Sequence, residues 1–167
     1  MSTITDDFKI ILQKGKSPSQ ISLRVIRITA TYPISTTGIE GGFAPPTPTA
    51  RYVITRATKS DVFTISTELR PHGTPRLGPA KTQELKVADH VELIAKLQGL
   101  LRDLPPQYPG AQDLYGRNIS IVHVTDPGAF VDFHRTGSAA GFGIPQPTEG
   151  QKVQFDEAVA IVEKLGG

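Results

Sequence analysis

The chain of 167 residues has no cysteine, no tryptophan, one methionine and 7% aromatic residues. Without thiols it can form neither a disulfide framework nor a thiolate-bound structural zinc site. It also has no apolar run near the roughly 18 residues that a membrane-spanning helix needs. Its stability must therefore come from apolar packing, for which the length and a hydrophobic content of 38% suffice.

An excess of one charge is missing as well. The chain carries 18 Lys and Arg against 16 Asp and Glu, a net charge of +2, and the basic residues are scattered. Because nucleic-acid binding requires a concentrated basic surface, we expect no nucleic-acid partner. The acidic Asp6 and Asp7 near the start do not fit a targeting segment, so we expect a cytoplasmic protein without membrane association. Secretion after processing stays open as an alternative.

The common catalytic motifs are absent. The sequence contains no GxxxxGK[ST] phosphate loop, no GxGxxG after a strand, no HExxH and no GxSxG. We therefore expect no cofactor and no resident metal, and we favour a non-catalytic protein. Acid-base sites need no local signature, so an enzyme stays open as the alternative.

Prolines and glycines mark the predicted loops. The 14 prolines cluster with many of the glycines, and each proline removes a backbone donor that a strand or helix interior would use. We predict one domain over residues 1–167 with four long Pro/Gly-rich loops at 33–50, 70–82, 105–118 and 136–150. Long loops in compact domains often carry function.

Alternating apolar residues between these loops predict strands. The predicted segments are a short strand containing Phe8, Ile10 and Leu12, a strand over 21–31, a hairpin of 52–57 and 62–69, and a pair at 119–124 and 129–134.

Apolar stripes at helical spacing predict two amphipathic helices, at about 89–104 and 149–165. Asp89 with Glu92, and Thr148 with Gln151, are placed as N-terminal capping boxes. Because strands and helices do not alternate regularly, we predict an α+β fold with a mostly antiparallel sheet packed by the two helices.

One group of residues could support acid-base or metal chemistry. If a two-residue turn joined the last strand pair, His123, Asp132 and His134 would share one sheet face, opposite the face of Val122 that we take as the core side. Two imidazoles and a carboxylate are suitable zinc or iron ligands or an acid-base pair. These three residues are the candidate site of the alternative interpretation, a small enzyme or ligand-binding protein. The more common role of such histidines is packing.

The segment Gly41-Gly42-Phe43-Ala44-Pro45 is the leading binding candidate. It places one large aromatic side chain between a flexible diglycine and a proline-rich run, a shape suited to docking into a partner's cleft. Phe43 could instead cover a sheet edge. We favour a protein-binding module, and we keep a homodimer open because residues 52–69 would pair readily if they formed an edge of the sheet.

The residues Gly41-Gly42-Phe43-Ala44 resemble the glycine-glycine-phenylalanine loop of the emfourin family, small protein inhibitors of thermolysin-like metalloproteases. The order of helix, Asp113-Leu114-Tyr115, strand pair and terminal helix is similar too. The resemblance implies a scaffold that presents this loop to a protease active site. The sequence departs from the family pattern at Pro45, where the family tends to have glycine, and in residues 50–88, which have no clear counterpart.

Overall fold

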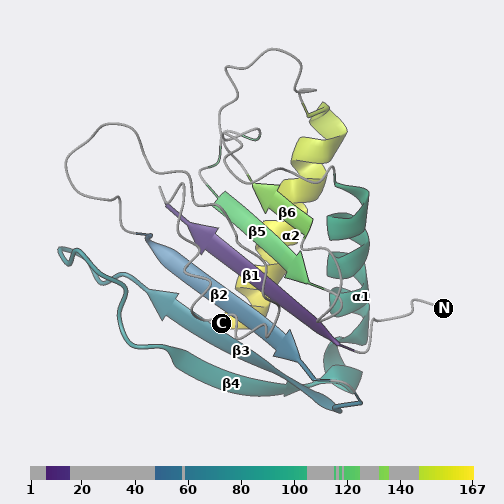
Figure 1. Cartoon of the computed structure of the whole chain (residues 1–167), viewed down its shortest axis with the longest axis horizontal. Helices are drawn as coiled ribbons and strands as arrows, with labels where there is room; N and C mark the ends of the chain where they lie inside the picture. The colour runs from purple at the N-terminus through teal and green to yellow at the C-terminus, as the bar shows by residue number, and fades with distance from the viewer. Residues whose placement is uncertain are drawn as a thin grey trace, which may run out of the picture.

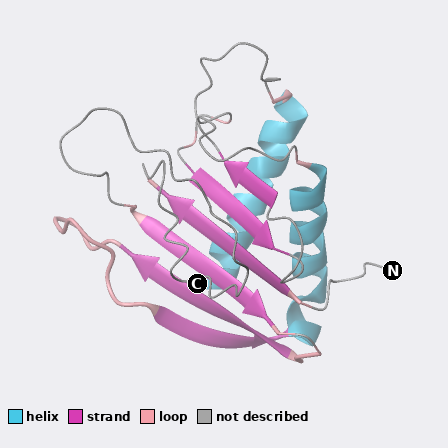
Figure 2. Cartoon of the chain, in the orientation of Figure 1, coloured by secondary structure: helices cyan, strands magenta, loops and turns pink. Residues whose placement is uncertain are grey.

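The computed structural model describes residues 7–15, 48–57, 59–104, 115, 117, 119–124, 132–135 and 147–167. Over these residues the chain forms one six-stranded sheet with two helices on one face (Figure 1). Figure 2 shows both helices running behind the same sheet. The predicted α+β class, an antiparallel sheet packed by helices, is confirmed.

The sheet order is β4-β3-β2-β1-β5-β6, and every neighbouring pair is antiparallel. The strands are β1 (Phe8–Lys14), β2 (Ala50–Arg56), β3 (Val62–Leu69), β4 (Lys81–Lys86), β5 (Ile119–Val124) and β6 (Asp132–Arg135). The helices are α1 (Val87–Asp103) and α2 (Glu149–Gly166). The predictions for residues 21–31, 33–47, 105–114 and 136–146 lie outside the described residues.

The core lies between the sheet and the helices. Ile10, Ile54 and Ile65 are in register across β1, β2 and β3, and each is 0% exposed. The alternation of apolar residues places their side chains on one face. The helices contribute apolar residues to the same cluster, which includes Ile94, Leu97, Leu101, Phe155, Ala158 and Val162.

The predicted hairpin is confirmed, but it is not at an edge. Its turn contains Lys59 with a φ of 60°, and the Ser60 amide donates to the Ala57 carbonyl at 3.0 Å. The other side of β3 pairs with β4 over Val62–Thr67. Residues 52–69 therefore do not offer the free sheet edge on which the expectation of a homodimer depended.

Strand β4 was not predicted. The expected loop over 70–82 ends at residue 80, and residues 81–86 are a strand. Its sequence, KTQELK, is mostly polar, and its side chains are exposed apart from that of Leu85. An exposed edge strand buries too little to impose an apolar alternation on its sequence.

The two helix starts differ from each other. Thr148 and Gln151 form the predicted capping box: the Gln151 amide donates to Thr148 Oγ1 at 3.2 Å, and the Thr148 amide donates to Gln151 Oε1 at 2.8 Å. The predicted cap at Asp89 is wrong, because α1 begins two residues earlier, after Lys86. Strand β4 runs directly into this helix, and the Val87 amide donates to the Asp61 carbonyl at 2.8 Å.

Candidate functional site

All six strands have one of their ends at the same end of the sheet, which we call the loop end. Register places Lys14 beside Ala50 and Ile119, Ala50 beside Leu69, and Ser120 beside Arg135. Lys81 lies beside Thr67, near the end of β3. Strands β1, β3 and β6 therefore finish at the loop end, while β2, β4 and β5 begin there (Figure 1).

All four predicted Pro/Gly-rich segments consequently leave from or arrive at the loop end. The connection between β1 and β2 does both, and so does the connection between β3 and β4. The segment before β5 arrives there, and the segment after β6 leaves from there. Loops carried by a rigid scaffold are where binding residues concentrate.

The connection between β1 and β2 is closed at its base. The Thr49 amide donates to the Lys14 carbonyl at 2.8 Å. Gly15 has a φ of +100°, and a Cβ there would lie 2.9 Å from the Thr49 nitrogen. Residues 16–47 therefore start and finish at one point of the sheet. The predicted binding residues Gly41, Gly42, Phe43, Ala44 and Pro45 belong to this segment and lie outside the described residues.

Helix α2 braces the strands beside this end. Thr67 Oγ1 donates to the Gly166 carbonyl at 3.2 Å, and Gln83 Nε2 donates to the Leu165 carbonyl at 2.8 Å. Lys14 forms an ion pair with Glu163 of the same helix. The last turn of α2 is thus tied to β1, β3 and β4, which gives the loop end a firm support.

Tyr52 lies in the same region, and its environment disfavours ionisation. Burial raises the pKa of the Tyr52 phenol, and the nearby Glu163 carboxylate raises this pKa further. The positive charge of Lys14 lowers it and partly offsets these effects. At neutral pH the phenol is therefore protonated.

The histidine candidates share a face, but not the predicted one. Register pairs His123 with Asp132 and Ile121 with His134, so the three candidates lie on the same face of β5 and β6. His123 is also beside Ile10, on the side packed by the helices, and only 5% of it is exposed. The prediction that this is the side away from the core is therefore wrong. The pairing register is the one expected from the predicted two-residue turn, and residues 125–131, which contain that turn, lie outside the described residues.

The part of the chain that the structure describes contains no group of three His, Asp or Glu residues placed to hold a metal ion. Within the same part, neither helix has the length and apolar character needed to cross a membrane. Comparison of the chain with protein families, with curated proteins and with solved structures finds no match.

Proposed function

We propose that the protein is a non-catalytic protein-binding module that presents the segment containing Gly41–Pro45 from the loop end. The observation that carries the proposal is the closure at Lys14 and Thr49, where a 2.8 Å backbone hydrogen bond joins the two ends of the segment. Both ends are fixed to the central strands of a braced sheet. Fixing the ends of a binding segment lowers the conformational entropy that is lost when it docks.

The chemistry of the segment fits insertion into a cleft. Within Gly41–Pro45, Phe43 provides the one large apolar side chain. The two preceding glycines allow close approach to a partner's backbone, and Pro45 restricts the backbone that follows. A buried aromatic side chain is a common energetic centre of protein interfaces. On its resemblance to the emfourin loop, the partner that we propose is a thermolysin-like metalloprotease, inhibited by occupation of its active site.

The test is an inhibition titration of a thermolysin-like metalloprotease with a short peptide substrate. We expect the native chain to inhibit, and Phe43→Ala to weaken inhibition by about 30-fold or more, as for removal of a binding centre worth 2 kcal/mol or more. Val153→Ala is the matched control, because Val153 is 66% exposed on α2 and its truncation should leave inhibition unchanged. Equal inhibition by the native chain and Phe43→Ala, at equal stability, would contradict the proposal.

A small-ligand or enzyme site near His123, Asp132 and His134 is the second candidate. It is favoured by the register, which places the three residues on one face. The burial of His123 against the helix side weighs against it, because a substrate needs access to the reacting groups. Titration with zinc, followed by the NMR signals of the histidine rings, tests this candidate. Unmoved signals would remove it as a metal site.

Self-association as a homodimer is a separate proposal. In the described residues, the outer edge of β4 has no neighbouring strand. Lys81, Glu84 and Lys86 line this strand, and charged edge strands generally resist pairing. A homodimer, which we keep as a proposal, would therefore have to form through a surface other than the outer edge of β4. Size-exclusion chromatography with light scattering distinguishes a homodimer from a monomer.

A further inference from the structure

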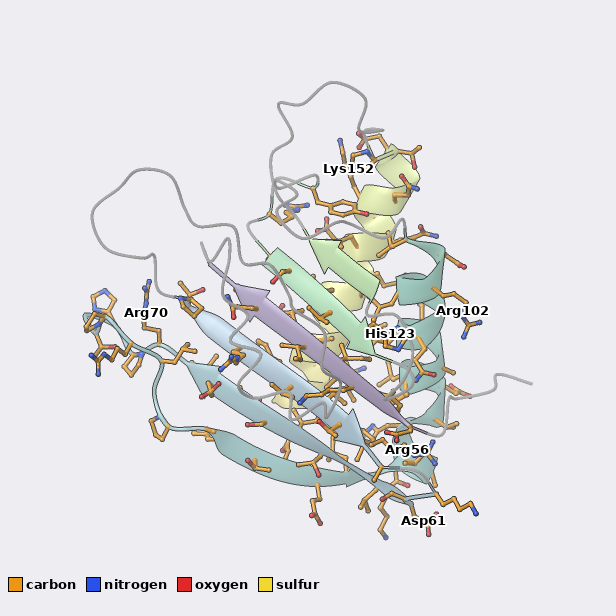
Figure 3. The ribbon with its side chains drawn as sticks, viewed as in Figure 1. Arg56, Asp61, Arg70, Arg102, His123 and Lys152 are labelled. Atoms are coloured by element: carbon orange, nitrogen blue, oxygen red, sulfur yellow. The ribbon has the colours of Figure 1, made fainter. Side chains whose placement is uncertain are left out.

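The connection between β3 and β4 carries a concentrated positive charge. Residues 70–81, which we call the basic loop, contain Arg70, His72, Arg76 and Lys81 and no acidic residue. Residues 70–76 and 79–81 are exposed. Figure 3 shows Arg70 where this loop projects beyond the sheet at the loop end. The local charge contrasts with the near balance of the whole chain.

The basic loop is also held in one conformation. Its base closes through the Gly78 amide, which donates to the Leu69 carbonyl at 2.8 Å. Its tip is locked by Thr74, whose amide and hydroxyl both donate to the Pro71 carbonyl, at 3.1 and 2.8 Å. Gly73, with a φ of +77°, permits the tight turn between them.

Prolines stiffen the same loop at positions 71, 75 and 79. A stiff charged loop differs from a flexible basic tail, because its charges are held at defined separations before a partner arrives. Less conformational entropy is then lost on binding.

We infer that the basic loop binds an acidic peptide segment, through the carboxylates of a protein partner. The inference rests on the proposed function, because it names the chemistry of a partner held at the loop end. A guanidinium group pairs with a carboxylate through two parallel hydrogen bonds, which gives direction as well as charge attraction. Arg76 has no ion pair with any residue that the structure describes, so its guanidinium is available for such a contact.

The composition of the loop favours an acidic peptide over a nucleic acid. Residues 70–81 contain no Phe, Tyr or Trp on which a base could stack. The net charge of the chain is only +2, and the basic loop is one compact patch rather than a stripe along a duplex. Three or four neighbouring carboxylates match its size better.

The experiment measures binding of a fluorescein-labelled hexaglutamate peptide to the full chain by fluorescence anisotropy. Arg76→Gln should weaken binding about tenfold, as expected for the loss of one charge-assisted contact. Arg102→Gln is the matched control, since Arg102 is exposed on α1 and its substitution removes the same charge away from the loop (Figure 3). It should change binding less than twofold.

A second variant separates recognition by a fixed loop from general charge attraction. Thr74→Val keeps every charge and nearly the same side-chain shape, but it removes the hydroxyl bond to the Pro71 carbonyl. We expect it to weaken hexaglutamate binding several-fold. Unspecific attraction would leave the affinity unchanged.

Several outcomes would overturn the inference: no hexaglutamate binding, equal losses for Arg76→Gln and Arg102→Gln, or an unchanged affinity in Thr74→Val. Tighter binding of a single-stranded oligonucleotide of equal charge would also overturn it, in favour of a nucleic-acid partner. Failure of the proposed function is distinguishable. A chain that binds hexaglutamate but does not inhibit the protease contradicts the proposed partner class alone. A chain that inhibits the protease without binding hexaglutamate contradicts this inference alone.

Discussion

Two glycine-to-alanine substitutions in the helices should have opposite effects on stability. At Gly166, the last residue of α2, an added Cβ would lie 2.6 and 2.8 Å from Cδ1 and Cε1 of the Tyr52 ring and 3.1 Å from Thr67 Oγ1. Tyr52 is a core residue with 8% exposure, so its ring cannot easily move away. At Gly99, inside α1, an added Cβ would meet no atom within 4 Å.

The expected magnitudes follow from these distances. Gly99→Ala should stabilise the protein by about 0.5–1 kcal/mol, the usual gain of alanine over glycine in a helix. In Gly166→Ala the gain in helix propensity is smaller, because the residue is at a helix end. The added Cβ also incurs an overpacking cost of about 1–3 kcal/mol. It also disturbs the hydrogen bond from Thr67 to the Gly166 carbonyl. We expect a net loss of about 1–2 kcal/mol, which lowers the Tm by about 2–4 °C per kcal/mol for a chain of this size.

The assay is equilibrium unfolding in urea, with the native chain and both variants compared at one pH. Equal slopes of the free energy of unfolding against urea concentration would show that the unfolded states are comparable. If Gly99→Ala stabilised the chain and Gly166→Ala were as stable as the native chain, the last turn of α2 could not be seated against Tyr52. The account of a braced loop end would then be wrong.

Three further predictions follow from the same contacts. Thr148→Ala should lower the free energy of unfolding by about 1 kcal/mol, because it removes the hydroxyl that accepts from the Gln151 amide. Asp89→Ala should cost less, because Asp89 does not cap α1, and thermal unfolding compares the two variants. Burial raises the pKa of Tyr52 and of Tyr115, so these phenols stay neutral in the folded protein at a pH where they ionise in the unfolded chain. Their contribution to the free energy of unfolding should be fully present below about pH 10 and should be lost as the pH rises further. Urea unfolding across that pH range measures this loss. Phe155→Ala should lower the free energy of unfolding by about 3–5 kcal/mol, because Phe155 is 0% exposed and stacks on the Tyr115 ring with centroids 4.4 Å apart. A decrease of less than about 1 kcal/mol in urea unfolding would refute this packing.

Local patterns predicted the elements that bury one face. The strand containing Phe8, the hairpin and both helices carry apolar residues at period two or at helical spacing, and each is found where it was expected. Thr148 is a correct cap because α2 begins directly after it, which brings Thr148 Oγ1 and Gln151 Oε1 to the unpaired backbone amides of that first turn.

The errors arose where distant contacts decide the structure. In β5, Ile121 and Val122 are both buried, at 0% and 1% exposure, so alternation alone could not tell which side faces the helices. Pairing with β1 decides this by placing His123 beside Ile10. Strand β4 is held by its pairing with β3 and buries little of its own surface. The start of α1 depends on the contact of Val87 with Asp61, which no capping motif announces.

The candidate site was partly foreseen. The Pro/Gly-rich segments were predicted as loops, but their common location needs the strand order and register, which come from long-range pairing. The basic loop was predicted as part of the connection over 70–82. Its significance depends on the lock at Thr74, and this lock is visible only in the folded structure.

The central claim is that the protein binds its partner with the loop end of the sheet. The most direct measurement is backbone amide NMR of the labelled full chain, titrated with an inactivated thermolysin-like metalloprotease. We predict that the perturbed amide signals fall at residues 41–44, at Thr49 and in the basic loop, while the exposed sides of α1 and α2 stay unchanged. Perturbations confined to the helices, or around His123 alone, would contradict the claim.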